Sequence, residues 1–344
     1  MPVEFTYEGL PGRVCFAPGR AAGRLAEEVS ALGLRRLMVI TGGTGTALAR
    51  DVTRDVAGLV AARFTGVRPH VPADVADTAR RVAADSAADG LVTIGGGSAT
   101  GTGKIVALTT GLPLICVPTT YAGSEVTPVW GMTTAGRKET GRDPRVLPRS
   151  VVYDADLTTT LPRTLTVASA LNAMAHCVEA YWAPGANPVT SLIATEGIRL
   201  LAAGLREPGD SGREQLLHGS YLAGSAFAVA GSALHHKICH VLGGAFDLPH
   251  AETHAVLLPH VLAFNADAAP QAEAAIAGAL AAPAAVPALS ELYRDVGAPD
   301  GLAGLGLTRE QLDRAVELVA DRLPIANPRP VRRRDVVRIL ESAY

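Results

Sequence analysis

Short apolar runs alternate with helical patterns over the first 155 residues of the chain. The runs are bounded by Gly, Pro or Thr and lie at residues 37–41, 91–94, 114–117 and 151–153. Such alternation is typical of a parallel β-sheet with helices on its faces. The segment at 73–89 has apolar residues at helical spacing, so we expect an amphipathic helix that crosses between two strands.

The second half of the chain has a different pattern. After Leu161 the β-branched runs end, and stretches rich in Ala, Leu and Glu continue with helical periodicity almost to the C-terminus. The expected helices are residues 164–182, 188–205 and 212–231, followed by a histidine-rich pair around 235–265. We therefore predict an α/β domain at residues 1–156 and an all-helical domain at residues 157–344.

Composition supports two folded domains and limits the classes of function. The 344 residues are enough for two hydrophobic cores, and 48% hydrophobic against 19% charged residues argues against disorder. With 31 basic and 33 acidic side chains the net charge is -2, so no broad positive field attracts nucleic acid or an anionic membrane. The four cysteines are scattered, and we find no membrane span or secretory signal, so we expect free thiols and a cytoplasmic protein.

A glycine-rich turn follows the strand expected at 91–94. Gly95, Gly96, Gly97 and Ser98 lead into the next helical pattern. Residues without Cβ let the backbone approach a pyrophosphate, whose charge the N–H groups at a helix start stabilise. The spacing is neither G-x-G-x-x-G nor a Walker motif, so the turn alone fits a dinucleotide site and a simple tight turn equally.

A second polar segment, residues 118–128, follows the strand expected at 114–117. It contains Thr119, Thr120, Ser124 and Thr127. Ligands of open α/β sheets bind at the carboxyl ends of the strands, so a dinucleotide crossing both turns would meet these hydroxyl groups. The alternative is a loop whose Ser and Thr side chains satisfy their own backbone.

Six of the nine histidines fall within twenty-six residues. They are His235, His236, His240, His250, His254 and His260. His236 and His240 share a helix face, with Lys237 beside them, and His250 and His254 repeat the same spacing. Several imidazoles with an amine on neighbouring helices favour a catalytic or binding site over packed histidines.

Asn172 and His176 share a face of an earlier predicted helix. Together with further imidazoles they would suit a divalent transition metal if Asn172 were a carboxylate. A neutral amide brings no charge to offset the cation, so Asn172 also fits a structural hydrogen bond in the helical core.

These segments together resemble the iron-containing alcohol dehydrogenase superfamily and, within it, the maleylacetate reductases. The matching residues are 95–101, 118–128, 136–138, 140–143, 172–176, 234–244 and 248–254. The resemblance runs nearly end to end. It implies an α/β dinucleotide-binding domain followed by an all-helical catalytic domain, the fold shared with dehydroquinate synthase.

The resemblance also implies which residues would hold a metal. Metal-dependent members use one Asp and three His, at positions that correspond here to Asn172, His176, His236 and His250. Because the Asp is absent, as in maleylacetate reductases, we expect no catalytic metal. If an ion binds, His176, His236 and His250 would hold it.

The implied reaction is the NAD(P)H-dependent reduction of the C=C bond of maleylacetate, or a substituted analogue, to 3-oxoadipate during aromatic-ring degradation. Hydride addition puts negative charge on the ketone oxygen as an enolate, which Lys237 and protonated His236 or His240 would stabilise. A neighbouring imidazole would protonate the enolate carbon, and His250 and His254 would line the other side of the site.

The small dicarboxylate substrate needs partners for its two anionic ends. Asn172, His176, Tyr121 and Arg145 are the candidates for binding it. Arg145 belongs to a basic cluster with Arg137, Lys138 and Arg142, for which a solvated surface loop is the alternative. We expect Lys138 to contact the cofactor.

The residues after the strand at 37–41 bear on the choice of cofactor. The sequence Thr41-Gly42-Gly43-Thr44-Gly45-Thr46 offers no acidic side chain for the ribose 2′-hydroxyl, so we expect NADH with NADPH tolerated. A homodimer is the expected assembly. The alternatives are a metal-dependent alcohol dehydrogenase or carbonyl reductase of the same superfamily, and a dehydroquinate synthase-like lyase that oxidises and reduces its nicotinamide only transiently.

Overall fold

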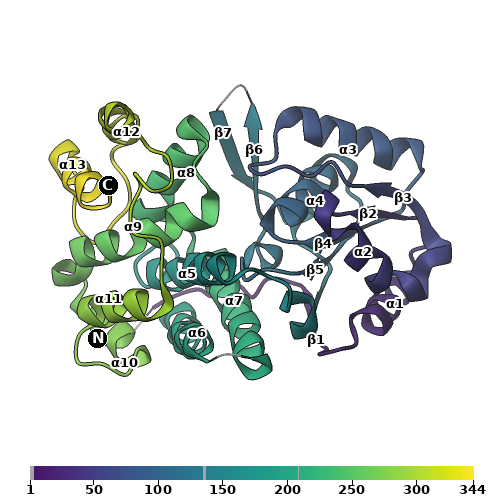
Figure 1. The fold of residues 1–344 in the computed structure, drawn as a ribbon, viewed down its shortest axis with the longest axis horizontal. Helices are drawn as coiled ribbons and strands as arrows, with labels where there is room; N and C mark the ends of the chain where they lie inside the picture. Colours follow the sequence, from purple (N-terminus) through teal and green to yellow (C-terminus); the bar gives the residue numbers. More distant parts are fainter. Residues whose placement is uncertain (1–3, 135–136, 208) are drawn as a thin grey trace. The chain divides into compact units, whose positions relative to one another are not determined.

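The computed structural model describes residues 4–134, 137–207 and 209–344, and the chain divides into two compact units. The sheet unit is Pro11–Leu161, and the helical unit is Pro162–Tyr344 together with residues 4–10. In Figure 1 the sheet unit is coloured from purple to teal, and residues 162–344 of the helical unit from teal to yellow. Among the helices that the structure describes, none is long and apolar enough to cross a membrane.

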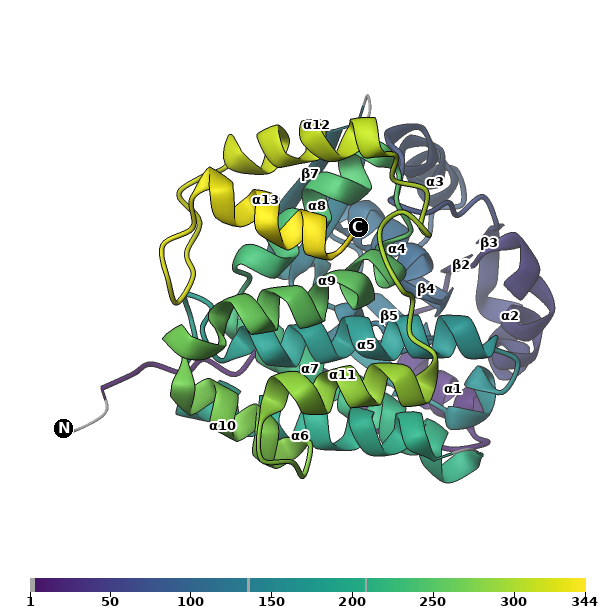
Figure 2. The same cartoon turned by 60° about the vertical axis from the view of Figure 1, so that its left-hand side comes forward.

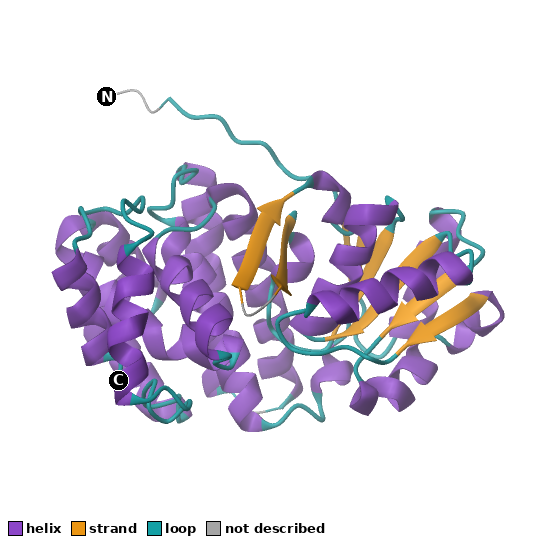
Figure 3. Ribbon diagram, turned by 90° about the horizontal axis from the view of Figure 1, so that it is seen from above, coloured by secondary structure: helices purple, strands orange, loops and turns teal. Residues whose placement is uncertain are grey.

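The sheet unit contains six parallel strands in the order β1-β8-β5-β4-β2-β3, drawn in orange in Figure 3. Their bounds are Arg13–Phe16 for β1, Ser150–Tyr153 for β8, Leu114–Pro118 for β5, Gly90–Gly95 for β4, Leu37–Ile40 for β2 and Val60–Phe64 for β3. The four inner strands are the apolar runs expected from the sequence. Their side chains are almost all buried, as is usual for a parallel sheet covered on both faces.

Helices cover both faces of this sheet. They are α1 Ala21–Ala31, α2 Thr46–Val52, α3 Ala73–Asp85 and α4 Gly97–Thr110. Helices α1 and α2 share a hydrophobic core with Val92 and Ile94, whereas α4 packs on the opposite face, against Thr93. A Cβ atom at Gly103 of α4 would lie 2.4 Å from Cγ2 of Thr93, so this glycine is what lets α4 approach the sheet.

A separate antiparallel hairpin follows β5. Strand β6, Val129–Thr134, pairs with β7, Arg137–Arg142, and Trp130 and Met132 of β6 pack beside α3 and α4. The basic cluster weighed as a surface loop therefore lies in part on a strand. The sequence of β7 has no alternating apolar residues that would predict a strand. The strand forms by pairing with β6.

The described residues of the helical unit form nine helices. These are α5 Arg163–Ala180, α6 Pro188–Arg206, α7 Asp210–Ala230, α8 Leu234–Phe246, α9 His250–Asn265, α10 Pro270–Ala279, α11 Ala285–Val296, α12 Arg309–Ala320 and α13 Arg333–Ser342. Figure 2 turns this unit forward. Helix α5 is buried on every side from Val167 to Ala180, so its polar side chains lie inside the protein. The predicted fold class, α/β followed by all-helical, is confirmed.

Candidate functional site

The glycine-rich turn lies at the carboxyl end of β4, next to the point where the order of the strands in the sheet reverses. The chain runs from β2 out to β3 and then returns to β4 on the other side of β2. Ligands of open α/β sheets bind at such switch points, beyond the carboxyl ends of the strands. The turn therefore occupies the part of the sheet unit where a dinucleotide would be expected.

The backbone of this turn suits a phosphate. Gly95 has a φ of +148°, a conformation that other residues rarely adopt, and Gly97 is the first residue of α4. Gly96 precedes the helix and has no side chain to cap it. The Ala99 N–H donates to the Gly96 carbonyl at 3.0 Å, and the N–H groups of Gly97 and Ser98 stay available to an anion.

The second polar segment lies directly beside the glycine turn. Gly95 is paired with Pro118, and the Thr119 N–H donates to the Gly95 carbonyl over 3.1 Å. A Cβ atom at Gly96 would lie 2.9 Å from Cγ2 of Thr120. The structure thus brings together the two segments that the sequence suggested for the cofactor.

A buried lysine holds the far end of the second segment. Lys104 of α4 is 1% exposed, and its Nζ donates to the carbonyls of Ser124 at 2.6 Å, Thr127 at 2.8 Å and Val129 at 2.8 Å. It also donates to Thr127 Oγ1 at 3.0 Å, so the Thr127 side chain is used within the fold. Ser124 Oγ is buried and has no hydrogen-bond partner among the described residues, which leaves it for a ligand.

Burial lowers the pKa of Lys104 to about 8, and this predicts an unusual effect of pH on stability. The ordinary value is 10.5, so between these pH values the unfolded chain binds more protons than the folded one, and stability rises with pH. The free energy of unfolding of the parent chain, minus that of Lys104→Met, is expected to increase by about 2–3 kcal/mol from pH 7 to pH 10. Urea unfolding of both chains measures it, and a constant difference would contradict the assignment.

Three other residues expected near ligands have varied surroundings. Tyr121 is 1% exposed and its hydroxyl donates to Thr158 Oγ1 at 2.9 Å, which favours a structural role. Arg145 is exposed, and its guanidinium donates to both carboxylate oxygens of Asp143, at 2.9 and 2.7 Å, so its charge is already compensated. Lys138 lies half-buried on β7, and the side chain of Arg137 and the whole of residue 136 lie outside the described residues.

The helical unit gathers His176 and five of the six closely spaced histidines into one cluster, to which His260, expected to be structural, does not belong. Helix α5 supplies His176, α8 supplies His236 and His240, and α9 supplies His250 and His254. The ring centroids are 5.0 Å apart for His176 and His236, 4.7 Å for His236 and His254, 4.5 Å for His250 and His254, and 6.1 Å for His236 and His240. His235 of α8 joins them, with Nε2 at 3.0 Å from Nδ1 of His254.

The cluster contains buried polar atoms that no described residue satisfies. They include Oδ1 of Asn172, Nδ1 of His176 and Nε2 of His254. A buried polar atom without a hydrogen bond costs about 1–3 kcal/mol, so several in one place indicate that a ligand completes the site. This favours a binding role for Asn172 over the structural alternative.

The electrostatics of the cluster differ from a uniformly cationic pocket. Burial lowers the pKa of His235 to about 3 and holds the pKa values of His176 and His254 well below the ordinary range. The neighbouring imidazoles, His236 among them, lower all three further. These three rings are therefore neutral at pH 7, because close imidazoles in a buried site cannot all be charged.

Glu179 belongs to this site and was not among the residues expected from the sequence. It lies on α5, is 1% exposed, and has Oε2 at 2.5 Å from Nδ1 of His236. Its Oε1 accepts the backbone N–H of His235 at 2.7 Å. Burial raises the pKa of Glu179, and His235 and the N–H groups at the start of α8 oppose that rise. The available signal was a carboxylate three residues after His176 in a largely apolar helix.

The donors implied for a family metal carry no negative charge. Asn172 and His176, with two further imidazoles, supply only neutral donors, and Glu179 is engaged by His235 and His236. A buried cation without an anionic ligand has little to offset its lost hydration.

A second group of possible ligands lies beside it. His235 Nε2, Cys239 Sγ and His254 Nδ1 are all within 4.8 Å of one another, and the thiol would bring a negative charge on ionisation. Two contacts within this group are hydrogen bonds. They join His235 Nε2 to His254 Nδ1 at 3.0 Å and Cys239 Sγ to His235 Nε2 at 3.6 Å.

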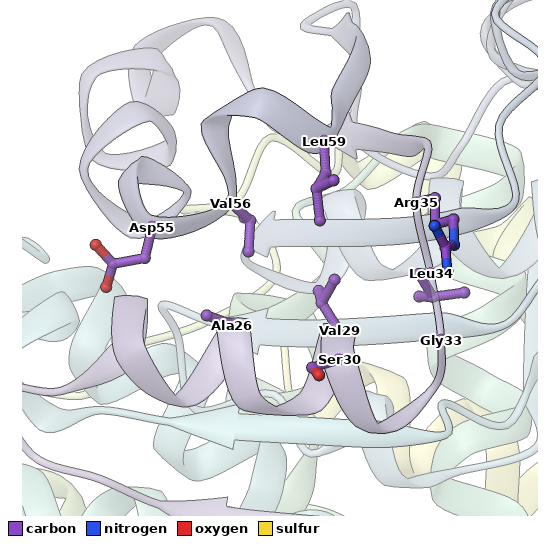
Figure 4. A pocket seen from close by; sticks show the side chains of 9 residues that line it. All are labelled: Ala26, Val29, Ser30, Gly33, Leu34, Arg35, Asp55, Val56 and Leu59. Atoms are coloured by element: carbon purple, nitrogen blue, oxygen red, sulfur yellow. The ribbon is translucent and has the colours of Figure 1, made fainter.

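A pocket on the sheet unit lies elsewhere, at α1 and the 3-10 helix Arg54–Leu59 (Figure 4). Its lining residues are Ala26, Val29, Ser30, Gly33, Leu34, Arg35, Asp55, Val56 and Leu59. None of the residues expected to bind cofactor or substrate lines it.

Comparison with known proteins places the chain in a family. Residues 11–155 match the family described as iron-containing alcohol dehydrogenase, and residues 166–344 match its C-terminal part. The sequence is 44% identical to maleylacetate reductase of Pseudomonas knackmussii and 46% identical to that of Burkholderia cepacia, covering 99% of this chain and 98% and 97% of those proteins.

Solved structures agree with this result. The crystal structure of maleylacetate reductase from Rhizobium sp. strain MTP-10005 has a TM-score of 0.92 and 41% identity, covering 99% of this chain and 98% of that one. The resemblance seen in the sequence motifs is confirmed: the chain belongs to the iron-containing alcohol dehydrogenase family.

Proposed function

We propose that the chain is an NAD(P)H-dependent maleylacetate reductase, which reduces the C=C bond of maleylacetate or a substituted analogue to the corresponding 3-oxoadipate. The observation that carries the proposal is the 43–46% identity, over nearly the whole chain, to relatives named maleylacetate reductase. The imidazole cluster, with its neutral Asn172, supports it because positioned hydrogen-bond donors can stabilise an enolate without a metal ion.

The proposed cofactor is NADH, with NADPH tolerated. The turn at Gly95–Ser98 and the start of α4 would hold the pyrophosphate, and Thr119, Thr120 and Ser124 offer hydroxyl groups beside it. Lys138 is retained as a further contact. When bound, the reduced nicotinamide supplies the hydride.

The helical unit would stabilise the charge that develops on the substrate. Hydride addition to the C=C bond that is conjugated with the ketone makes an enolate, and the Lys237 ammonium and the His240 side chain, both on α8, would donate to its oxygen. The enolate carbon then takes a proton. Because burial keeps His176, His235 and His254 neutral, the less buried His240 and His250 are the proposed proton donors.

The substrate's carboxylates need hydrogen-bond donors. His176 is proposed here because its buried Nδ1 has no partner among the described residues and can donate when it carries the proton, and Asn172 is proposed because its amide can offer Nδ2 as a donor. Arg145 is a weaker candidate, since Asp143 already pairs with it, and Tyr121 is used within the fold. The absence of a catalytic metal, a homodimer and a cytoplasmic location also remain predictions.

One assay tests the function. Purified enzyme is expected to consume NADH in proportion to added maleylacetate, to accept NADPH more slowly, and to keep its activity after extensive dialysis against a chelator. Absorbance of the reduced nicotinamide measures all three, and mass spectrometry identifies 3-oxoadipate.

The same assay separates the alternatives. Activity that is lost on chelation and returns with iron or zinc would favour a metal-dependent alcohol dehydrogenase or carbonyl reductase, for which the group of His235, Cys239 and His254 is the specific observation. Product formation without net NADH consumption would favour a dehydroquinate synthase-like lyase.

A further inference from the structure

We propose that Glu179 is a positioning residue that sets the tautomer of His236, keeping the proton on Nδ1 and leaving the lone pair on Nε2. The inference rests on the proposed function only in the consequence it has for turnover. The contacts that carry it are independent of the substrate.

The first step concerns the start of α8. A helix begins with N–H groups that have no acceptor within the helix, and Ala233, which precedes α8, has no side chain that can cap it. Oε1 of Glu179 takes this role by accepting the His235 N–H at 2.7 Å. A backbone N–H can only donate, so Oε1 must accept.

The second step concerns the other carboxylate oxygen. With Oε1 held by α8, Oε2 lies 2.5 Å from Nδ1 of His236, and both side chains are almost fully buried. An ionised carboxylate accepts at both oxygens, and the start of a helix stabilises negative charge. Nδ1 of His236 must then carry a proton, which in the neutral ring leaves Nε2 as the acceptor.

The third step concerns the variant Glu179→Gln, which distinguishes a role of Glu179 in positioning the His236 proton from a role in packing alone. Its side chain has nearly the same shape, but only one oxygen can accept while the nitrogen can only donate. If the amide oxygen keeps the His235 N–H, the amide nitrogen faces Nδ1 of His236. Nδ1 then has to accept, and the proton moves to Nε2.

The experiment uses protein with 15N-labelled histidine, because the two nitrogens of an imidazole have different chemical shifts in each tautomer. The His236 signals are assigned by their loss in His236→Gln. The parent protein is expected to carry the proton on Nδ1, and Glu179→Gln is expected to move it to Nε2. Turnover of maleylacetate should fall about 10–100-fold in Glu179→Gln, with the KM for NADH unchanged.

Glu28→Gln is the matched control. Glu28 is also 1% exposed and hydrogen-bonded, to Ser150 at 2.8 Å and Arg13 at 2.8 Å, but it belongs to the sheet unit and to no proposed site. This variant should leave the His236 spectrum and the turnover as in the parent, whatever it does to stability.

Several results would overturn the proposal. A proton on Nε2 of His236 in the parent protein does so directly, even if Glu179→Gln fails to fold. A folded Glu179→Gln that keeps the Nδ1 tautomer, or that changes tautomer without losing turnover, also does so. A parent protein that shows the expected tautomer but does not reduce maleylacetate would contradict the proposed function and leave the positioning role standing.

Discussion

Lys237→Met is expected to lower kcat for maleylacetate about 10²–10³-fold, the usual loss when one donor to a developing oxyanion is removed. Lys237 is half-buried on α8, next to His236. Methionine keeps an apolar stem of similar length, so packing is preserved while the charge is lost. The affinity for NADH should stay close to that of the parent, because the proposed cofactor segments belong to the sheet unit. Steady-state kinetics and fluorescence titration with NADH measure the two quantities.

Lys237→Arg is the matched control, since it keeps the positive charge and should retain more of the activity than methionine. A methionine variant with normal kcat would remove Lys237 from the mechanism. Equal losses in both variants, with weakened NADH binding, would instead indicate that the side chain supports the structure of α8.

Acid is expected to destabilise the protein by several kcal/mol between pH 7 and pH 4. The pKa of His235 is about 3 in the folded protein and 6.5 ordinarily, so the unfolded chain binds more protons throughout this interval. The stability from keeping His235 neutral is present above pH 6.5 and is lost as the pH falls, about 3 kcal/mol from this residue at pH 4. His176 and His254 act in the same direction. Denaturant unfolding followed by circular dichroism at several pH values measures the loss.

His235→Gln separates this residue from the carboxylates that also titrate in acid. The variant is expected to lose less stability than the parent between pH 7 and pH 4, by about 3 kcal/mol. Parallel curves for parent and variant would show that the His235 ring does not stay neutral in the folded state.

The inner strands could be predicted because burial on both faces demands continuous apolar runs, and β2, β4, β5 and β8 have them. The edge strand β3 was missed because Val60–Phe64 includes a basic residue and is only half-buried. Hairpin strand β7 was missed because its exposed, polar sequence depends on pairing with β6 rather than on a core.

Some residues of the candidate site could likewise be predicted from the sequence, and others could not. Imidazoles spaced four residues apart on helices could be recognised from the sequence because helical geometry places them on one face. The role of Glu179 could not, since it depends on α8 arriving 57 residues later in the chain. The role of Lys104 could not be predicted either, because its Nζ donates to backbone carbonyls more than twenty residues further along the chain, and only folding brings them together.

The lysine within α4 has a consequence for how readily the proposed cofactor would bind. The same helix begins at the glycine turn and, through Lys104, fixes the carbonyls of Ser124, Thr127 and Val129. The conformational entropy of that loop is therefore lost when the protein folds, and little remains to be lost when a ligand arrives. Loosening this anchor should therefore weaken the affinity for the proposed dinucleotide, because the loop would then lose that entropy on binding.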